Sequence, residues 1–427
     1  MNRTKFWIDT RDSFWFVPLI YTSISVLLVF AINILDSWLI DSFKEGIPKL
    51  LVTDKDVSIE LYGSLATAIL TMTTISFSVI MVVLTTYSTQ FSPRTLQDFM
   101  RSKVTHHVLG VYCFGFTFAL LNLVIVGKNN VIAGPIFMVI IALFCLAFFV
   151  FFIHHSARWL QVNSLIGKIR NDAVKVIQHV YKKENYEEYE KWDEDEIDEI
   201  KEMQKTDIYT IRSGYVQIIE WNKLVNYTEK NQCTIDLHVQ VGDFIPKGFP
   251  LLSVYNHESD YKLEEINHIL VVGDERTDIQ DAEFMIQKLV EISLKAISPA
   301  INDPHTAINC INRIGVLLIE IGEQYKEIKY IADRSGNLRI LNHPKKYEDY
   351  LYKSFYQIRY YGKSDVSVMY SLIEVLYKIA LVSDDAIKEK VWKFHHYIVD
   401  NIKWDSLSNL DYNHLTAIYE KFEYCCK

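Results

Sequence analysis

Long apolar runs separated by short polar segments fill the first 155 residues. The runs span about residues 14–35, 60–87, 108–126 and 131–153. A helix rises about 1.5 Å per residue, so each run is long enough to cross a hydrocarbon core of roughly 30 Å. The pattern therefore predicts a transmembrane domain of four helices at residues 1–155.

The second apolar run carries hydroxyl side chains at helical spacing, which we call the hydroxyl line. At about 100° per residue, its members fall within an arc of about 60° on one face of a helix. Met81 and Val82 interrupt the line near its middle. The members are Thr67, Thr71, Thr74, Ser78, Thr85 and Thr89.

Two interpretations of the hydroxyl line stay open. Small and hydroxyl residues let membrane helices approach closely and share hydrogen bonds, which predicts a packing face. Alternatively, the line faces water along a path, and Met81 and Val82 form an apolar constriction that gates by dewetting. Four spans are too few for a roomy pore, so the second interpretation requires a ring of identical subunits.

The distribution of lysine and arginine sets the expected orientation, because positive charge accumulates on the cytoplasmic side of membrane proteins. The N-terminus, the loop after the second run and the segment after the fourth run hold nine such residues, whereas the other two loops hold four. We therefore expect both termini in the cytoplasm and the protein in the inner (plasma) membrane. Arg94 and Arg101 then lie at the cytoplasmic mouth of the second span.

Periodicity divides the rest of the chain into three segments. In residues 156–207, apolar residues recurring every three or four positions predict an amphipathic helix, followed by an acidic linker. Residues 208–272 contain short runs rich in β-branched and aromatic residues, which predict a small β-rich subdomain. Residues 273–427 return to helical spacing. The expected fold is a four-helix transmembrane region plus a cytoplasmic α+β domain with a helical C-terminal region.

One stretch of the β-rich segment has a recognisable shape. Val241-Gly-Asp-Phe-Ile-Pro-Lys-Gly248 resembles a hairpin of the barrel-sandwich hybrid found in biotinyl and lipoyl domains. Gly242-Asp243 supplies a turn, and Gly248 permits a bend in the backbone. The carrier motif, a modifiable lysine between two hydrophobic residues, does not occur here. We therefore expect a barrel-sandwich-like subdomain without a carrier function.

Two polar loops flank a predicted helix of the C-terminal segment and hold the candidate chemistry. Asp303 is a good N-cap, and Pro304 is a good first residue for the helix that follows. Glu275 and Arg276 can pair and hold their own loop. These local roles account for residue types that would also suit acid–base work, so we predict no catalytic residue. We expect instead a cytoplasmic polar hub, formed where the two loops dock on each other. Its members are Asp274, Glu275, Arg276, Ser298, Asn302, Asp303 and His305.

Charge and cysteine content narrow the classes of partner. From residue 156 onward, 34 lysines and arginines stand against 44 aspartates and glutamates. This acidic balance argues against nucleic acid and against docking on anionic lipid. The six cysteines lack the spacing of a disulfide framework or a metal site, so we expect reduced thiols. We predict no metal and no cofactor.

Four blocks of sequence carry a resemblance. They are Thr71–Ser78 with Gln90–Arg94, Ser213–Gln217, Asp274–Thr277 with Gln280–Asp281, and Ala296–Ala307. Together they resemble the domain of unknown function 2254 family of predicted bacterial membrane proteins. The resemblance implies four spans and a cytoplasmic region, and it brings no activity, substrate or catalytic residue. The family often has Leu-Ser-Pro-Gly where this chain has Ile297-Ser-Pro-Ala300.

These observations lead to one leading hypothesis and two rivals. The leading hypothesis is a homo-oligomeric, channel-like protein whose second span lines a path for ions and whose cytoplasmic domain regulates it. The expected partners are the lipid bilayer and further copies of the chain. The first rival is a non-conducting sensor or scaffold, in which the hydroxyl line only packs. A membrane-anchored enzyme is the less favoured second rival.

Overall fold

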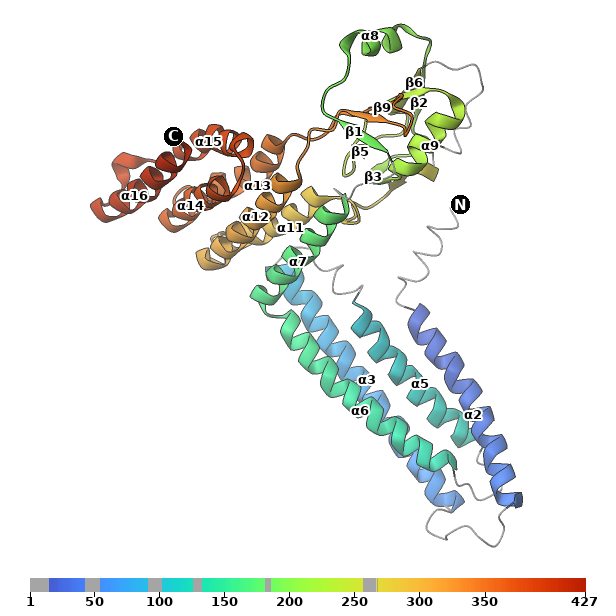
Figure 1. The fold of residues 1–427 in the computed structure, drawn as a ribbon. Helices are drawn as coiled ribbons and strands as arrows, with labels where there is room; N and C mark the ends of the chain where they lie inside the picture. Colours follow the sequence, from blue (N-terminus) through green and yellow to red (C-terminus); the bar gives the residue numbers. More distant parts are fainter. Residues whose placement is uncertain are drawn as a thin grey trace. The chain divides into compact units, whose positions relative to one another are not determined.

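The computed structural model describes residues 15–42, 54–90, 102–125, 133–180, 186–255, 266 and 268–427. The chain divides into two compact units, Met1–Ser164 and Leu165–Lys427, which we call the membrane unit and the C-terminal unit. Figure 1 shows the helices and strands of both. Each unit is described by itself below.

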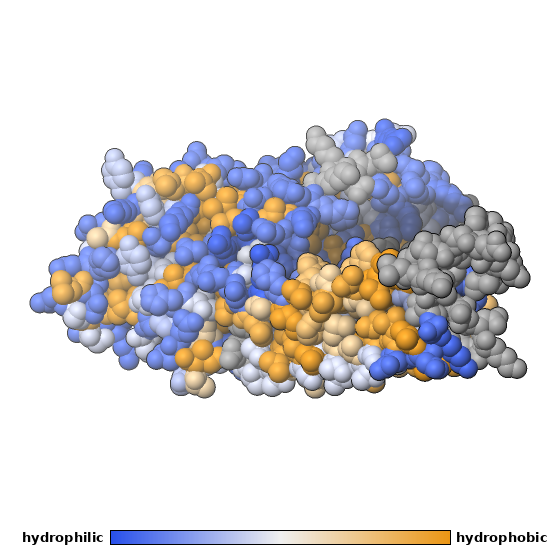
Figure 2. Space-filling model, turned by 90° about the horizontal axis from the view of Figure 1, so that it is seen from below, coloured by the Kyte–Doolittle hydropathy of each residue, from blue (hydrophilic) through white to orange (hydrophobic). Residues whose placement is uncertain are grey.

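Among the residues that the structure describes, the membrane unit contains four helices that are long and apolar enough to cross a membrane, which confirms the predicted number of apolar helices. On the face seen in Figure 2, apolar side chains gather over this unit. Two helices begin earlier in the chain than predicted, because their first turns are polar and lie outside the apolar runs. The helices are α2 (Phe16–Ser42), α3 (Lys55–Gln90), α5 (Lys103–Ile125) and α6 (Ala133–Trp159).

Helix α5 is the most buried of the four and packs against each of the others. Its glycines make the close approaches possible. A Cβ atom on Gly110 would lie 2.8 Å from Cδ2 of Tyr21 in α2, and one on Gly115 would lie 2.8 Å from Sγ of Cys145 in α6. In lipid, such small residues stabilise helix pairs by allowing tight van der Waals contact.

A carboxylate anchors α6 to α2. Asp36 is buried, and its Oδ1 and Oδ2 accept hydrogen bonds from the backbone N–H groups of Ala133 (2.6 Å) and Gly134 (3.2 Å). The first N–H groups of a helix have no partner within the helix and carry partial positive charge. Asp36 therefore caps α6 from a neighbouring helix, which explains a charged residue at the end of an apolar span.

The C-terminal unit begins within α7 (Val162–Val180), whose buried stripe agrees with the predicted amphipathic helix. Two sheets follow. The larger has the strand order β1-β8-β9-β4-β6-β2, and the smaller has the order β5-β3-β7. All pairs are antiparallel except β4 and β9, which are parallel. The strands are β1 (Glu187–Tyr189), β2 (Lys205–Tyr209), β3 (Gly214–Ile219), β4 (Thr234–Leu237), β5 (Phe244–Ile245), β6 (Pro250–Tyr255), β7 (Leu270–Gly273), β8 (Tyr330–Ala332) and β9 (Leu338–Leu341).

The sheets differ from the predicted barrel-sandwich shape, because the described strands form two open sheets and close no barrel. The hairpin of β8 and β9 inserts beside β4 and extends the larger sheet toward β1. Three elements lie where the sequence predicted other structure. Strand β1 and helix α8 (Glu194–Glu202) lie in the expected acidic linker, and the hairpin lies in the expected helical segment. Helix α9 (Trp221–Asn231) interrupts the predicted run of strands.

The helices from α11 onward form a two-row array. Helices α11 (Ala282–Ala296), α13 (Tyr347–Gly362) and α15 (Asp385–Val399) pack as one row, and α12 (Pro304–Gln324), α14 (Val366–Val382) and α16 (Asn409–Cys426) pack as the other. Figure 1 shows these successive hairpins. The N-cap side chains are Asp281, Asp303, Asp365, Asp384 and Ser408, which confirms the predicted cap at Asp303.

Replacing Gly115 with valine tests the central position of α5. The new side chain has no room between Cys145 and Ile69, so helices must separate, and we expect a loss of about 1–3 kcal/mol of stability. Thermal unfolding of the detergent-purified chain measures the loss. Gly63→Val in α3 is the matched control, because a Cβ atom there meets nothing within 4 Å. Equal melting temperatures for the two variants would contradict this packing.

Candidate functional site

The hydroxyl line lies on the outward face of α3. The seven buried positions of α3 at this depth occupy the opposite side of the helix, at about 100° per residue. They are Tyr62, Ala66, Ile69, Ser76, Ile80, Val83 and Tyr87. All six hydroxyl residues are exposed, and so are Met81 (61%) and Val82 (58%). Among the described residues, the unit therefore does not use this face for its own packing.

Each hydroxyl of the line donates a hydrogen bond to its own helix. The acceptor is the backbone carbonyl four residues earlier, at 2.9–3.1 Å. A hydroxyl bonded in this way needs no partner from a second helix, and it tolerates lipid, water or another protein surface. Arg94 and Arg101, predicted at the cytoplasmic mouth, lie outside the described residues.

The C-terminal unit holds a buried ion network around Arg276, which precedes α11. The guanidinium binds Asp281 through two bonds, Nε to Oδ2 at 2.6 Å and Nη2 to Oδ1 at 3.1 Å. Nη2 also donates to Oε1 of Glu283 (3.1 Å), and Nη1 donates to Oε1 of Gln287 (3.1 Å). The guanidinium lies 5.2 Å from the ring centre of Phe284. The planar fork of arginine suits such a multiply bonded site, whereas lysine could not replace it.

Glu283 connects this network to more distant parts of the chain. Its Oε2 accepts from Nζ of Lys345 (3.0 Å) and of Lys353 (2.9 Å), so five charged groups share one site. Burial by itself would raise the pKa of Glu283, but the two lysines outweigh this effect and hold it at about 2. The carboxylate is therefore ionised at neutral pH.

The network also holds the sheets against the helices. The turn between β4 and β5 passes directly over it, because a Cβ atom on Gly242 (φ +93°) would lie 2.3 Å from Oδ2 of Asp281. Lys345 Nζ donates to the carbonyl of Val241 at 3.2 Å. Gln280, next to Asp281, accepts from the N–H of Ile219 in β3 (3.0 Å). A change in this network must therefore move either the β4–β5 turn or the start of α11.

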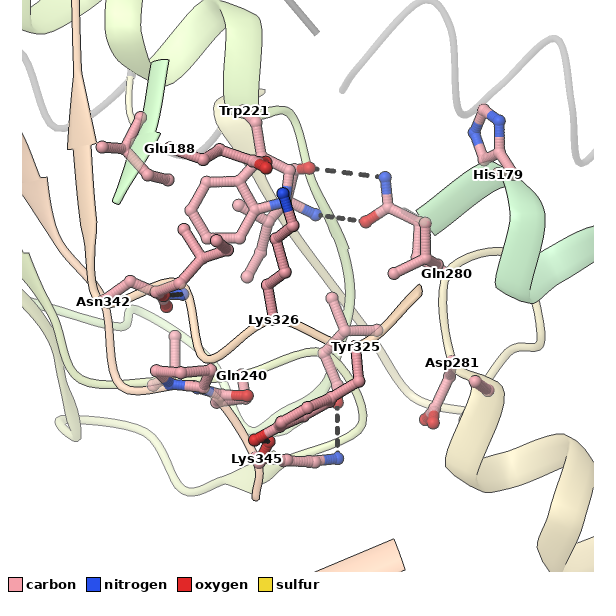
Figure 3. A pocket seen from close by; sticks show the side chains of 18 of the residues that line it. His179, Glu188, Trp221, Gln240, Gln280, Asp281, Tyr325, Lys326, Asn342 and Lys345 are labelled. Carbon is pink, nitrogen blue, oxygen red and sulfur yellow. Dashed lines mark hydrogen bonds between the residues drawn. The ribbon is translucent and has the colours of Figure 1, made fainter. Parts of the chain in front are cut away.

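A cavity of about 190 Å³, lined by polar and apolar groups, opens beside the network. Figure 3 shows that its lining comes from the end of α7, from the sheets and from the start of α11. Amide, imidazole, phenol and charged groups line it together with apolar side chains such as Val239 and Ile331, so a small ligand with both polar and apolar parts is the chemical class that it suits. The labelled polar and aromatic residues are His179, Glu188, Trp221, Gln240, Gln280, Asp281, Tyr325, Lys326, Asn342 and Lys345.

The structure does not bring the predicted polar hub together. Helix α11 separates the two loops by its own length, about 22 Å for 15 residues. At its far end, Asp303 caps α12 by accepting from the N–H (3.1 Å) and hydroxyl (2.6 Å) of Thr306. Asn302 has a positive φ of 52°, and the Ser298 hydroxyl donates to a backbone carbonyl. The side chains of His305, Asp274 and Glu275 are exposed. Of the seven residues, Arg276 is the one that the network contains.

Sequence reasoning missed most of the network. Asp281 belongs to a block that carries the family resemblance, yet Glu283, Lys345 and Lys353 belong to none of the quoted blocks. Lys353 lies 70 residues from Glu283 in the chain. No periodic or motif signal joins residues so far apart, so only the tertiary fold could reveal this pairing.

Comparison with known proteins gives three findings. A family model described as predicted membrane protein (DUF2254) matches residues 11–378. Uncharacterized proteins of Mycobacterium tuberculosis (strain CDC 1551 / Oshkosh) and Mycobacterium bovis (strain ATCC BAA-935 / AF2122/97) are 24% identical over 322 residues. The match covers 72% of this chain but 60% of each relative, so it spans well under two thirds of their length. No solved structure matches the chain.

Replacing Glu283 with glutamine tests the network through pH. The pKa of Glu283 falls from an ordinary 4.5 to about 2 on folding, so its stabilising effect is complete above pH 4.5 and is lost as the pH falls to 2. We expect Glu283→Gln to cost about 3 kcal/mol at pH 7 and progressively less below pH 4.5. Urea unfolding at several pH values measures this difference.

The matched control is Glu389→Gln, which removes a carboxylate from an exposed pair with Lys393. Exposed pairs are screened by water and contribute little, so we expect almost no change in the free energy of unfolding at any pH. A cost for Glu283→Gln that stays constant down to pH 2 would contradict the low pKa.

Proposed function

The chain belongs to the DUF2254 family of predicted membrane proteins, and from this premise we propose that it is a homo-oligomeric, channel-like protein. In this proposal, α3 lines a path for ions through the membrane. The C-terminal unit lies in the cytoplasm and regulates the path. The observation that carries the proposal is the outward exposure of the hydroxyl line on the side of α3 opposite to its packed face.

The argument starts from what the membrane unit leaves uncovered. Its exposed α6 surface is apolar, with Leu143 and Phe144 each 61% exposed, as expected of a helix that faces lipid. The outward face of α3 differs, because hydroxyl groups run along it over six turns. Hydroxyl and other small side chains are enriched where membrane helices approach one another or face water. If copies of the chain form a ring around an axis, this face of α3 would both contact neighbouring copies and face a water-filled path.

Charge supports the proposed orientation. The lysine and arginine counts at the span ends favour a cytoplasmic C-terminal unit, and Arg94 follows α3 on that side. A ligand in the 190 Å³ cavity of the C-terminal unit would touch Lys345 and Asp281, which belong to the ion network. Such a ligand could change how the β4–β5 turn is held, and this would be the regulatory input.

A non-conducting sensor or scaffold is the second candidate. It is favoured by the hydrogen bonds of the hydroxyl line, which are all satisfied within α3 and require no water. A membrane-anchored enzyme has less support, because Arg276 and Asp303 are committed to the ion network and to a helix cap.

The conduction part of the proposal predicts a loss of ion flux in the triple variant Thr71→Phe, Thr74→Phe, Ser78→Phe. Three bulky rings at the lining would close the path, and we expect flux through liposomes holding the full chain to fall about tenfold or more. The matched control is Ile136→Phe, Val139→Phe, Leu143→Phe, which places rings at the same spacing on the exposed face of α6. Flux that is absent from the unaltered protein, or that both variants leave unchanged, would sink the channel hypothesis.

The assembly part is tested separately by cysteine cross-linking in membranes. If copies meet at the hydroxyl line, Thr74→Cys in neighbouring subunits should form a disulfide-linked dimer on oxidation. Leu143→Cys on α6, which is also exposed, should not. Dimer formation is read from non-reducing gels. Equal cross-linking of the two variants would contradict an interface at α3, independently of the result of the flux measurement.

A further inference from the structure

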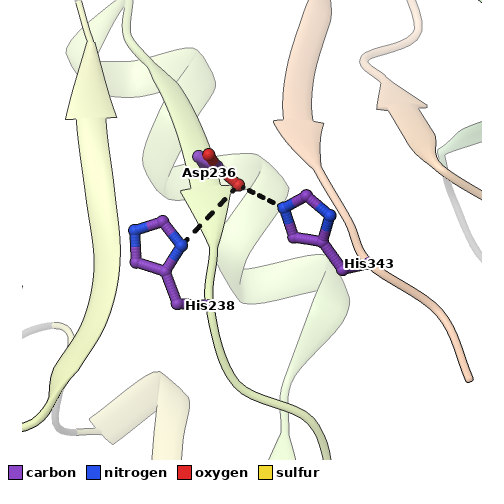
Figure 4. A group of neighbouring side chains, drawn as sticks. All are labelled: Asp236, His238 and His343. Carbon is purple, nitrogen blue, oxygen red and sulfur yellow. Dashed lines mark hydrogen bonds and ion pairs between the residues drawn. The ribbon is translucent and has the colours of Figure 1, made fainter.

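Three side chains that can bind a metal ion meet on one face of the larger sheet. Asp236 lies in β4, His238 follows this strand, and His343 follows β9. Because β4 and β9 run parallel with Asp236 opposite Leu341, the chain leaving β9 passes beside the end of β4. The oxygen and nitrogen atoms that could serve as ligands all lie within 4.8 Å of one another. Figure 4 shows the two imidazole rings on either side of the carboxylate.

Hydrogen bonds on the far side of His238 determine which of its nitrogens is free. Ser253 in β6 is fully buried, and its Oγ lies 2.6 Å from Oδ1 of Asp207 and 2.7 Å from Nε2 of His238. The Ser253 hydroxyl and Lys205 hold the pKa of Asp207 below its usual range, so this carboxylate only accepts. Ser253 therefore gives its one proton to Asp207 and accepts from Nε2–H of His238. In the neutral ring, Nδ1 is left without a proton.

The free nitrogen points toward the carboxylate. Nδ1 of His238 lies 3.9 Å from Oδ1 of Asp236, which is too far for a hydrogen bond. Two lone pairs that face each other repel unless a positive group lies between them. The same oxygen is 2.8 Å from Nε2 of His343, whose side chain is 66% exposed and can exchange its proton with water. Three ligand atoms thus surround a point where a cation would be stabilised.

We propose that Asp236, His238 and His343 bind a divalent transition metal, with zinc as the preferred ion. Two imidazole nitrogens and one carboxylate oxygen are a donor set that zinc accepts, whereas calcium and magnesium prefer oxygen ligands. Ligands at about 2.0–2.1 Å in a tetrahedron lie about 3.3 Å apart. The present separations, all within 4.8 Å, differ from this value by about 1.5 Å or less, which the exposed His343 side chain can supply. The bond from His238 to Ser253 is the kind of outer-shell support that orients a metal-binding histidine.

The fourth coordination position would face a cavity of about 260 Å³ that Asp236 and His343 help to line. Lys201, Lys329 and Lys346 line the same cavity and outnumber its one glutamate, Glu327, which pairs with Lys329 at 3.7 Å. Their positive charge lowers the affinity for a bare cation, so an anion or a hydroxide is the expected fourth ligand. The bound metal would also hold the end of β4 to the chain that leaves β9. These two strands form the parallel pair of the larger sheet.

Serine, histidine and aspartate in this order also suggest a hydrolytic triad, but the geometry excludes one. Ser253 is fully buried, and it donates its proton to Asp207 instead of presenting its oxygen to solvent. A nucleophile must reach its substrate and must pass its proton to the histidine. The metal site is therefore the chemistry that this cluster supports.

The test is calorimetric titration of zinc chloride into the full chain, freed of any purification tag and treated with a chelator. We expect one zinc per chain with a micromolar or lower Kd, and a bound cobalt(II) substitute should show the absorption of a tetrahedral site. His238→Ala and His343→Ala should each weaken binding about tenfold or more. Ser253→Ala should also weaken it, because His238 then loses the acceptor that selects its tautomer.

Two control variants test whether zinc binds at this site or elsewhere in the chain. His396→Ala removes an exposed histidine of α15 and should leave binding unchanged. Cys425→Ser with Cys426→Ser removes the adjacent thiols near the C-terminus and should also have no effect. Circular dichroism checks that each variant is folded. Absence of binding, binding that survives both histidine changes, or binding that is lost only with the cysteines would overturn the proposal.

Discussion

A polar group that leaves water must find a partner, and this constraint organises both units. Burying an unpartnered amide, hydroxyl or charge costs several kcal/mol, which exceeds most single packing gains. In the membrane unit, Asp36 accepts hydrogen bonds from the first N–H groups of α6. Each hydroxyl of the line donates a hydrogen bond to a carbonyl of its own helix. The bundle can therefore keep a carboxylate within an apolar surround while leaving a hydroxyl-bearing face outside its own core.

The same constraint explains how the C-terminal unit is assembled. Arg276 could not be buried alone, and its two carboxylate partners require further cations, which Lys345 and Lys353 supply. Removing one partner would leave a buried charge uncompensated, so the network behaves as a unit. Its members come from the start of α11, from the segment after β9 and from α13. The helical array and the sheets are thus joined by charges, in addition to apolar contacts.

The sequence predicts features that depend on neighbours in the chain. Four apolar helices, the amphipathic α7 and the cap at Asp303 follow from length, period and a single residue type. The hairpin of β8 and β9 could not be predicted in the same way, because its strands have three and four residues and gain stability from pairing with distant β1 and β4. The structure does not bring the predicted polar hub together for a related reason. Its two loops lie at opposite ends of one helix, and the residue types in two loops do not indicate how far apart the loops lie in space.

The short connection from Asn342 to Lys346 joins the remaining features. His343 reaches Asp236 on one side, while Lys345, two residues later, reaches Glu283 and the carbonyl of Val241. Both cavities of this region have Asn342 and Pro344 in their walls. A ligand or ion that moves this connection therefore changes contacts at the β4–β9 pair and in the buried ion network together. The connection is short and these contacts hold it at both ends, so it is the part of the chain that links the β4–β9 pair to the buried ion network.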